Sequence, residues 1–322
     1  MKKIVILDGY TINPGDLTWD MFRELGECRV YERTAAEEVV KRCRDAQIVL
    51  TSKAVFSKEV MEALPKLSYI GVLATGYNVV DIETARERNI TVTNIPAYST
   101  NSVAQMVFSL LFELCSHVKE HSDGVKQGRW SECRDFCYWD YPVIELAGKT
   151  MGIIGFGKIG QQTARIANAL GMKVMAWSRS RKKAEEGIDF SWADSLEDLL
   201  EKSDVVSLHC PLFKETEYMI NRETLKIMKS SAFLINTARG PLIRETDLAD
   251  ALNNGEIGGA ALDVLEEEPP RKDNPLFSAK NCVITPHIAW ASREARSRLI
   301  DIAFHNLKEY LAGRPVNRVD GV

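Results

Sequence analysis

The chain has 322 residues, of which 45% are hydrophobic and 27% are charged. This length favours two domains, and the composition is that of a folded globular protein, which excludes an intrinsically disordered chain. The 41 basic and 45 acidic side chains leave a net charge of -4. A slightly negative protein does not attract the negatively charged phosphate backbone of a nucleic acid, so we expect no nucleic-acid partner.

The chain also carries no pattern typical of a membrane or secreted protein. Its least charged stretch, residues 97–112, is shorter than the roughly 20 apolar residues of a membrane span. The apolar run after Met1 is a short strand pattern rather than a signal peptide. Seven scattered cysteines indicate reduced thiols, so we expect a cytoplasmic protein. Only Cys133 and Cys137 lie close together in sequence, and the histidines are dispersed, so we predict no metal site.

The first hundred residues alternate between short apolar runs and helical patterns. We predict strands at 3–7, 48–51, 69–72 and 91–93, with helical stretches such as 35–44 and 81–88 between them. Continuous apolar strands separated by helices predict a parallel sheet with helices on both faces.

The alternation then stops at one long helical pattern, residues 100–120, whose apolar positions form a single stripe. Residues 128–141 follow, and they are rich in Trp, Tyr, Phe and Cys without a clear period. We expect an ordered loop that serves as an interface arm. A homodimer through the long helix and this arm is therefore predicted.

A second alternating run begins at Thr150. The predicted strands are 151–154, 173–177, 205–208, 233–235, 260–262 and 283–285. Six strands with intervening helices suit a doubly wound dinucleotide-binding fold. A last helical pattern, 292–311, is expected to return to the first domain. The predicted domains are therefore 1–97 plus 291–322, and 98–290.

A glycine-rich turn lies at the start of this second run. Gly155, Gly157 and Gly160 match G-x-G-x-x-G, directly after one strand and at the start of a helix. Gly155 would form the tight turn, Gly157 would let a pyrophosphate approach, and Gly160 would let helix and strand pack closely. The backbone of Lys158 and Ile159 would add N–H groups at the helix N-terminus.

The residue type that follows the predicted strand 173–177 discriminates between NAD and NADP. An NAD site usually has an acidic residue there, which binds the ribose 2′-hydroxyl. This sequence instead has Trp177-Ser178-Arg179-Ser180-Arg181. Two arginines and two serines can receive a 2′-phosphate, so we favour NADP(H) over NAD(H), with NAD(H) retained as the alternative.

Three later strands each end near one charged or titratable residue, namely Arg239, Glu268 and His287. Ligands of open α/β sheets bind at these carboxyl ends, so we expect the three side chains to lie near the cofactor.

Taken together, these motifs resemble the D-isomer-specific 2-hydroxyacid dehydrogenase family over essentially the whole chain. The matching segments are Ala74–Asp81, Gly155–Gly160, the stretch around Arg239, Asp263, Glu268-Pro269 and Pro286-His287. The segment Pro286–Ser292 is most similar to the glycerate dehydrogenase/hydroxypyruvate reductase branch. The chain departs from the family at Ser178 and Arg179, which replace the usual acid.

The resemblance implies an NAD(P)-dependent reductase of a small 2-keto acid such as hydroxypyruvate or glyoxylate. Arg239 can span the carboxylate and keto oxygen with its fork of donors, and His287 can donate or accept the proton. Glu268 can hold the imidazole and stabilise its protonated form. The turn of Ala74, Thr75 and Gly76 can present N–H groups to the substrate carboxylate.

From the family pattern, the cofactor side would also be lined by Cys210, Pro211, Thr237 and Asp263. The implied fold class is α/β with two doubly wound parallel-sheet domains: a Rossmann-type cofactor domain and a flavodoxin-like substrate domain that acts as a catalytic lid. Two alternatives remain open. The substrate could be D-lactate's keto acid or a branched-chain 2-keto acid, or the protein could be a non-catalytic regulator that senses NAD(P)H.

Overall fold

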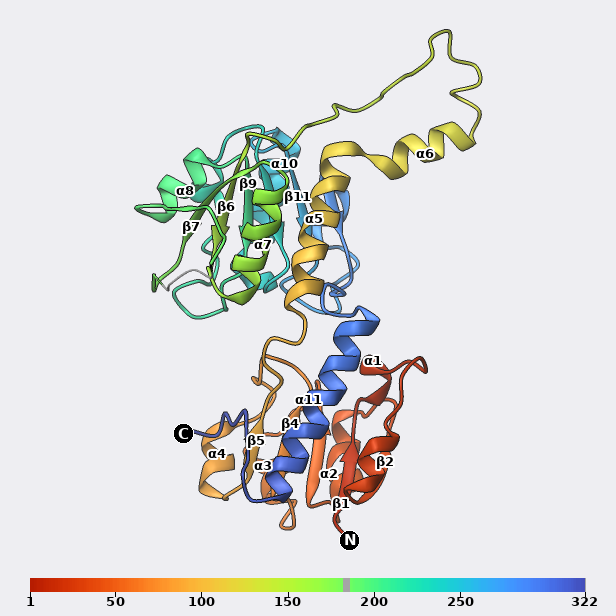
Figure 1. Cartoon of the computed structure of the whole chain (residues 1–322), viewed down its shortest axis with the longest axis vertical. Helices are drawn as coiled ribbons and strands as arrows, with labels where there is room; N and C mark the ends of the chain where they lie inside the picture. The colour runs from red at the N-terminus through yellow and green to blue at the C-terminus, as the bar shows by residue number, and fades with distance from the viewer. Residues whose placement is uncertain (182–185, 322) are drawn as a thin grey trace. The chain divides into compact units, whose positions relative to one another are not determined.

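The computed structural model describes residues 1–181 and 186–321, and it divides into two compact units (Figure 1). The first unit comprises Met1–Ser99 and Ala291–Val322, and the second comprises Thr100–Trp290. Within the described residues, no helix has the length and apolar character needed to cross a membrane.

The first unit is built on a five-stranded parallel sheet in the order β2-β1-β3-β4-β5. Its strands are β1 (Lys3–Ile6), β2 (Glu27–Val30), β3 (Ile48–Thr51), β4 (Tyr69–Val72) and β5 (Thr91–Thr93). This strand order is that of flavodoxin-like folds. The central strands β3 and β4 are buried along their whole length, which explains their continuous apolar sequence.

Short helices connect these strands, and one long helix returns from the end of the chain. They are α1 (Gly9–Ile12), α2 (Val39–Cys43), α3 (Lys58–Glu62), α4 (Ile82–Glu87) and α11 (Arg293–Leu311), with 3₁₀ turns at Asp20–Glu24 and Ala36–Glu38. Ser292 caps α11 by accepting from the N–H of Ala295. Within this unit, the Arg296 guanidinium forms two hydrogen bonds of 2.8 and 2.7 Å with the carboxylate of Asp16.

The second unit contains a seven-stranded parallel sheet in the order β12-β11-β10-β9-β6-β7-β8. Its strands are β6 (Thr150–Ile154), β7 (Lys173–Trp177), β8 (Ser191–Trp192), β9 (Val205–Leu208), β10 (Phe233–Asn236), β11 (Gly259–Leu262) and β12 (Cys282–Ile284). The strand order reverses between β6 and β9, as in Rossmann-type sheets, and ligands bind at such a switch point.

Hydrophobic cores cover both faces of this sheet. Successive residues of β10 alternate between them: Leu234 belongs to one buried cluster, and Phe233 and Ile235 belong to the other. The helices of the unit are α5 (Thr100–Ser116), α6 (Val118–Lys126), α7 (Lys158–Ala169), α8 (Leu196–Lys202), α9 (Arg222–Leu225) and α10 (Glu245–Asn254), with 3₁₀ turns at Gly240–Leu242 and Pro275–Ser278.

One predicted helix was only partly right, and two strands were missed. The 35–44 helix is a 3₁₀ turn followed by a short α-helix, and strands β2 and β8 were not predicted at all. The residues of β2 are partly or fully exposed and include Glu27 and Arg29, so they lack an apolar run. The strand β8 has only two residues, too few for a periodic pattern.

The predicted helix 100–120 is helical over most of its length but is interrupted at His117. Helix α5 ends at Ser116, and His117 adopts a left-handed conformation with φ of 48° before α6 begins. The His117 ring stacks on that of Tyr141 at 4.6 Å, and the carbonyl of Cys115 accepts from the N–H of Ile144. These contacts with the returning chain redirect the helix, and α6 with the loop after it extends away from the sheet of this unit (Figure 1).

Candidate active site

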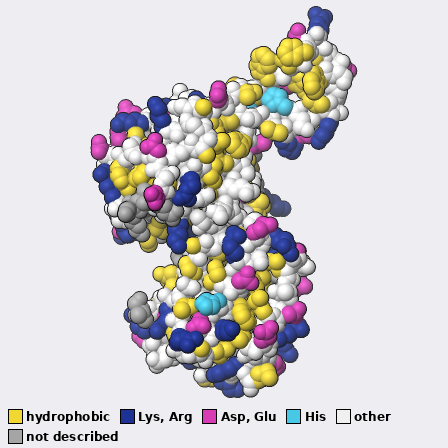
Figure 2. Space-filling model, in the orientation of Figure 1, with side chains coloured by type: hydrophobic (Ala, Val, Ile, Leu, Met, Phe, Trp, Pro, Cys, Tyr) yellow, Lys and Arg dark blue, Asp and Glu magenta, His cyan; other side chains and the backbone are white. Residues whose placement is uncertain are grey.

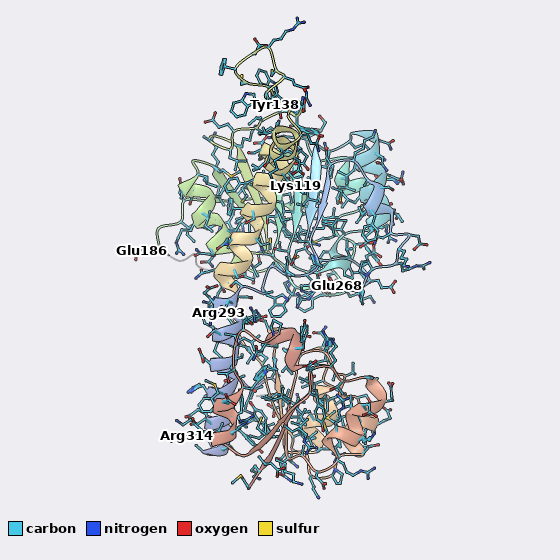
Figure 3. The ribbon with its side chains drawn as sticks, turned by 90° about the vertical axis from the view of Figure 1, so that its right-hand side faces the viewer. Lys119, Tyr138, Glu186, Glu268, Arg293 and Arg314 are labelled. Carbon is cyan, nitrogen blue, oxygen red and sulfur yellow. The ribbon has the colours of Figure 1, made fainter. Side chains whose placement is uncertain are left out.

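The predicted site residues of the second unit all follow strands of one parallel sheet. Parallel strands place their carboxyl ends at the same edge, so the segments after β6, β7, β9, β10, β11 and β12 share that edge. Glu268 lies at the end of this unit opposite the arm that carries Tyr138 (Figure 3).

His287 and Glu268 are in direct contact. The Nδ1 atom of His287 lies 2.6 Å from Oε2 of Glu268, and the N–H of Leu265 donates to the other carboxylate oxygen at 3.1 Å. Burial raises the pKa of Glu268, but the hydrogen bond and charge of His287, the Leu265 N–H and the Arg239 charge together outweigh it. The pKa of Glu268 is therefore lowered, and the group is ionised at neutral pH.

The structure also discriminates among the three adjacent acids. Glu266 is occupied elsewhere, because its Oε1 accepts from the N–H of Glu245 and its Oε2 from the hydroxyl of Tyr218. Only Glu268 contacts the imidazole of His287 among the hydrogen bonds of the described residues.

The segment that carries His287 is fixed by Asp263, which is 1% exposed. Its Oδ1 accepts from the hydroxyl of Thr285 and the N–H of Ile288, and its Oδ2 accepts from the N–H of Ala289. The carbonyl of Asp263 accepts from the N–H of His287 at 2.8 Å. Asp263 thus anchors the catalytic candidate, a role that the sequence pattern did not indicate.

This anchoring matters because His287 has a φ of 52°, which is uncommon for a residue with a side chain. The left-handed conformation costs about 1–2 kcal/mol, and it persists only where neighbouring contacts impose it. The hydrogen bonds to Asp263 supply that constraint.

Arg239 follows β10 on a short ordered turn. The buried side chain of Asn236 holds this turn, because its Nδ2 donates to the carbonyl of Arg239 and its Oδ1 accepts from the N–H of Ala238. The guanidinium of Arg239 is exposed, and its Nη1 donates to the carbonyl of Ala238 at 2.6 Å. Because a guanidinium carries five N–H donors, this exposed side chain can also donate to an anion.

The glycine turn after β6 has the shape required to hold a dinucleotide. Gly155 has a φ of 96°, and a Cβ there would lie 2.5 Å from the backbone nitrogen of Cys210. A Cβ on Gly160 would lie 2.3 Å from the carbonyl oxygen of Gly155. Gly157 differs, because no described atom lies within 4 Å of its Cβ position, and it begins α7 without a side-chain cap.

The geometry therefore leaves open space where a phosphate can approach the backbone. The first N–H groups of a helix lack intrahelical acceptors, so those after Gly157, including Lys158, Ile159 and Gly160, remain available to an anion. The Thr237 hydroxyl beyond β10 is buried and has no hydrogen-bond partner among the described residues. An open glycine cradle and an orphaned hydroxyl at one sheet edge fit a dinucleotide cofactor.

The segment after β9 contributes backbone rather than reactive side chains. The thiol of Cys210 is buried and lies 3.7 Å from the sulfur of Met219, and burial raises its pKa to about 11. The exposed Pro211 follows, and its carbonyl accepts from the hydroxyl of Thr216. His209 is partly buried, and desolvation of its imidazole lowers its pKa to about 4, so it is neutral at physiological pH.

Arg179 and Arg181 follow β7, next to Ser178 and Ser180, and residues 182–185 after them lie outside the described part of the chain. The guanidinium of Arg179 lies 5.3 Å from the centroid of the Phe213 ring. That of Arg181 lies 5.7 Å from the Trp192 ring and donates to the carbonyl of Ala193 at 3.2 Å. Arg179 is the freer of the two cations.

The turn of Ala74, Thr75 and Gly76 belongs to the first unit, at the carboxyl end of β4. It is held by the segment after β5: the Thr75 hydroxyl donates to the carbonyl of Ile95, and the side chain of Asn94 donates to the carbonyl of Thr75. In the described part of the chain, the N–H groups of Thr75 and Gly76 meet no protein acceptor. They are available to a carboxylate.

Metal-ligating groups do not gather anywhere in the described residues: no three His, Cys, Asp or Glu side chains are arranged to hold an ion.

Comparison with known proteins relates the chain to one enzyme family. The family "D-isomer specific 2-hydroxyacid dehydrogenase, NAD binding domain" matches residues 108–289. A hydroxypyruvate reductase of Blautia hydrogenotrophica is 53% identical over 321 residues, which cover 99% of this chain and 99% of that protein.

Solved structures agree with this likeness over both units. An NADPH-dependent glyoxylate/hydroxypyruvate reductase from Sinorhizobium meliloti is 29% identical with a TM-score of 0.84, covering 99% of this chain and 98% of that one. A D-lactate dehydrogenase with NAD+ from Lactobacillus jensenii is 28% identical with a TM-score of 0.82, covering 98% of this chain and 99% of that one. These two structures differ in cofactor, so the likeness does not select between NAD and NADP.

Proposed function

Because this chain belongs to the D-isomer-specific 2-hydroxyacid dehydrogenase family, we propose that it reduces hydroxypyruvate, and glyoxylate as a second substrate, to the D-2-hydroxy acid with NAD(P)H. The observation that carries this proposal is the contact of His287 with Glu268 at the carboxyl edge of a Rossmann-type sheet. A proton donor held at that edge is what keto-acid reduction requires beside a hydride source.

Each residue has a distinct part in this reaction. When bound, the nicotinamide supplies the hydride. Arg239 binds the substrate carboxylate and polarises the keto group, and His287 donates its proton to the oxygen as it becomes an alkoxide. Glu268 orients the imidazole and stabilises its protonated form, as the carboxylate does in a catalytic triad.

The two units take separate roles in this proposal. The second, predicted as residues 98–290, is the cofactor domain, since it holds the Gly155–Gly160 cradle, and Thr237 and the backbone at Cys210, Pro211 and Asp263 line the cofactor. The first, predicted as 1–97 plus 291–322, is the substrate domain, supported by the available N–H groups of Thr75 and Gly76.

The cofactor is proposed to be NADP(H) in preference to NAD(H). The support is the sequence Ser178-Arg179-Ser180 at the end of β7, which contains no acid. Among the described residues, the contact of the Arg179 guanidinium is with the Phe213 ring and not with a carboxylate. A 2′-phosphate accepts such charge-assisted hydrogen bonds.

Steady-state kinetics test the substrate and the cofactor together. Hydroxypyruvate, glyoxylate, pyruvate and a branched-chain 2-keto acid are each assayed with NADPH and with NADH. We expect the highest kcat/KM for hydroxypyruvate. A preference for pyruvate or the branched acid would instead establish the D-lactate or branched-chain alternative. Tight NAD(P)H binding with no keto-acid turnover would establish a sensing regulator.

We further propose a cytoplasmic homodimer. The free cysteines support a reducing compartment. The arm after α6 exposes apolar side chains along its length (Figure 2). The exposed fractions are 52% for Trp130, 89% for Phe136, 68% for Trp139, 41% for Tyr141 and 64% for Val143. Such a patch marks an interface, and a second copy is the partner that this chain itself supplies.

Size-exclusion chromatography with light scattering tests the dimer. We expect a dimer for the wild type and dissociation for a Phe136→Ser/Trp139→Ser variant. The matched control is Phe277→Ser, which removes an exposed ring elsewhere on the same unit and should leave the dimer intact. A monomeric wild type would refute this part of the proposal.

A further inference from the structure

Two of the three loops that carry candidate catalytic residues, those of Arg239 and Glu268, are joined by a buried carboxylate. Glu245 is the first residue of α10 and is 8% exposed. Its Oε1 accepts from the N–H of Glu266 at 2.7 Å, while the N–H of Glu245 donates to Oε1 of Glu266 at 2.9 Å. The two glutamates thus exchange side-chain-to-backbone hydrogen bonds in both directions.

Further contacts hold both members of this reciprocal pair. The second oxygen of Glu245 accepts from the side chain of Asn274 at 2.6 Å. The second oxygen of Glu266 accepts from the hydroxyl of Tyr218 at 3.4 Å, and the guanidinium of Arg244 lies over the Tyr218 ring at 4.1 Å. Both carboxylate oxygens of the buried Glu245 have a partner, as buried polar groups require, and so do those of the exposed Glu266.

The position of this pair in the chain relates it to the site. Glu266 stands two residues before Glu268, and Leu265 donates its N–H to Glu268. On the other loop, Arg239 is followed by Gly240, where a Cβ would lie 1.8 Å from the carbonyl oxygen of Leu265. The Arg239 loop therefore packs backbone to backbone against the Glu268 loop, and Glu245 closes the same junction five residues further on.

We propose that Glu245 is a positioning residue: through its reciprocal hydrogen bonds with Glu266 it holds the Glu268 loop against the Arg239 loop, and so keeps Glu268 in contact with His287. This inference rests on the proposed function, since it concerns the geometry of that same site. Among the hydrogen bonds and ion pairs of the described residues, Glu245 contacts none of the three candidate catalytic side chains.

The chemistry of Glu245 is suited to this task. Burial raises its pKa, and the charge of Glu266 acts in the same direction, while the bonds from the Glu266 N–H and from Asn274 lower it. Burying the carboxylate of Glu245 has an electrostatic cost. Its two oxygens offset that cost by accepting hydrogen bonds from Glu266 and Asn274.

The test uses the pH dependence of kcat/KM for hydroxypyruvate in the full-length enzyme. The variants are Glu245→Ala, Glu245→Gln, Glu268→Gln and the double variant Glu245→Ala/Glu268→Gln. Gln keeps an acceptor for the N–H of Glu266. The matched control is Asp250→Ala on the same helix. Asp250 is exposed, and its ion-pair partner among the described residues is Arg222.

The charged groups around His287 are Glu268 in direct contact, Arg239 within electrostatic range of Glu268, and Asp263, which binds the backbone beyond His287. None of these is changed in Glu245→Ala. We therefore expect this variant to lower kcat/KM between about tenfold and a hundredfold, as small misplacements of catalytic groups do. In the pH profile of kcat/KM, the alkaline limb of this variant should move to lower pH. Glu268→Gln should move the limb in the same direction.

Three further results are expected. Glu245→Gln should return the alkaline limb to its wild-type pH, and Asp250→Ala should have the wild-type profile. The double variant should have the same alkaline limb as Glu268→Gln alone, because both changes remove the same contact, that of Glu268 with His287. Cofactor affinity and urea midpoint are recorded for every variant. Should Glu245→Ala fail to fold, Glu245→Asp, which shortens the reach, replaces it and should move the limb in the same direction.

An unmoved limb in a folded Glu245→Ala or Glu245→Asp variant, or additive effects in the double variant, would overturn the inference and leave Glu245 a purely structural residue. Failure of the proposed function has a different signature. In that case His287→Ala would retain wild-type reduction of hydroxypyruvate, whatever the Glu245 variants do.

Discussion

Replacing Glu268 with Gln is the sharpest test of the site, because it keeps the shape of the side chain and removes its charge. Keto-acid reduction requires His287 in its protonated form. The carboxylate of Glu268, 2.6 Å from Nδ1, stabilises that form, so removing its charge should disfavour the protonated imidazole. The alkaline limb of reduction should therefore move to lower pH.

The size of this movement follows from the exposure of the pair. A hydrogen bond to a charged group contributes about 1.5–3 kcal/mol. The side chains of His287 and Glu268 are 43% and 37% exposed, so solvent screening reduces that value, and we take about 1–2 kcal/mol. Since one pH unit corresponds to about 1.4 kcal/mol, the limb should move by about one unit.

The assay is kcat/KM against pH with hydroxypyruvate as the varied substrate and saturating NADPH. Hydroxy-acid oxidation provides an independent check, because it needs neutral His287 and its acid limb should move to lower pH by the same amount. Glu267→Gln is the matched control, since Glu267 is an exposed neighbour. In the described part of the chain, the carboxylate bonded to His287 is that of Glu268. An unmoved or upward-moved limb in Glu268→Gln would refute the reasoning.

The remaining predictions concern cofactor choice, substrate binding and acid stability. Arg179→Ala should raise the KM for NADPH about ten- to a hundredfold and leave that for NADH nearly unchanged, because a charge-assisted phosphate contact contributes roughly 1.5–3 kcal/mol; equal effects on both cofactors would contradict this. Arg239→Lys keeps the charge but loses the bidentate fork, so kcat/KM for the keto acid should fall at least about tenfold with cofactor affinity unchanged, as fluorescence titration can show. His209 has its pKa lowered from 6.5 to about 4, so the unfolded chain binds its proton first and stability falls as pH drops through this interval. The shift corresponds to about 3 kcal/mol, and urea unfolding at several pH values should show a flatter profile for His209→Gln.

Sequence patterns predicted the elements whose environment is uniform along their length. The strands β3, β4, β9 and β10 are fully buried, so an unbroken apolar run marks each of them. The edge strand β2 was missed for the opposite reason: it is largely solvent-exposed, and what makes it a strand is its pairing with β1, a contact distant in sequence.

The long helix shows a second limit of local patterns. Its apolar stripe continues from Val103 to Val118, and nothing in the stripe marks its end. The end is imposed by Tyr141, which stacks on His117, and by Ile144, whose N–H donates to the carbonyl of Cys115. Both partners return from more than twenty residues further along the chain, beyond the reach of a helical period.

Within the site, the residue types were determined by the sequence and their partners by the fold. The glycine turn could be recognised because its steric demands are local: a strand end, a tight turn and a helix start lie in one short segment. The family resemblance assigned the imidazole partner to Glu268, the acid directly before Pro269, but the contacts of the three acids depend on the fold. Tertiary contacts engage Glu266 with Glu245 and bring Glu268 to His287. Likewise, only the pairing of β11 with β12 brings Asp263 to the backbone it anchors. The chemistry of a side chain is set by the residue type at one position. Its hydrogen-bond partner depends on which strands become neighbours in the folded chain.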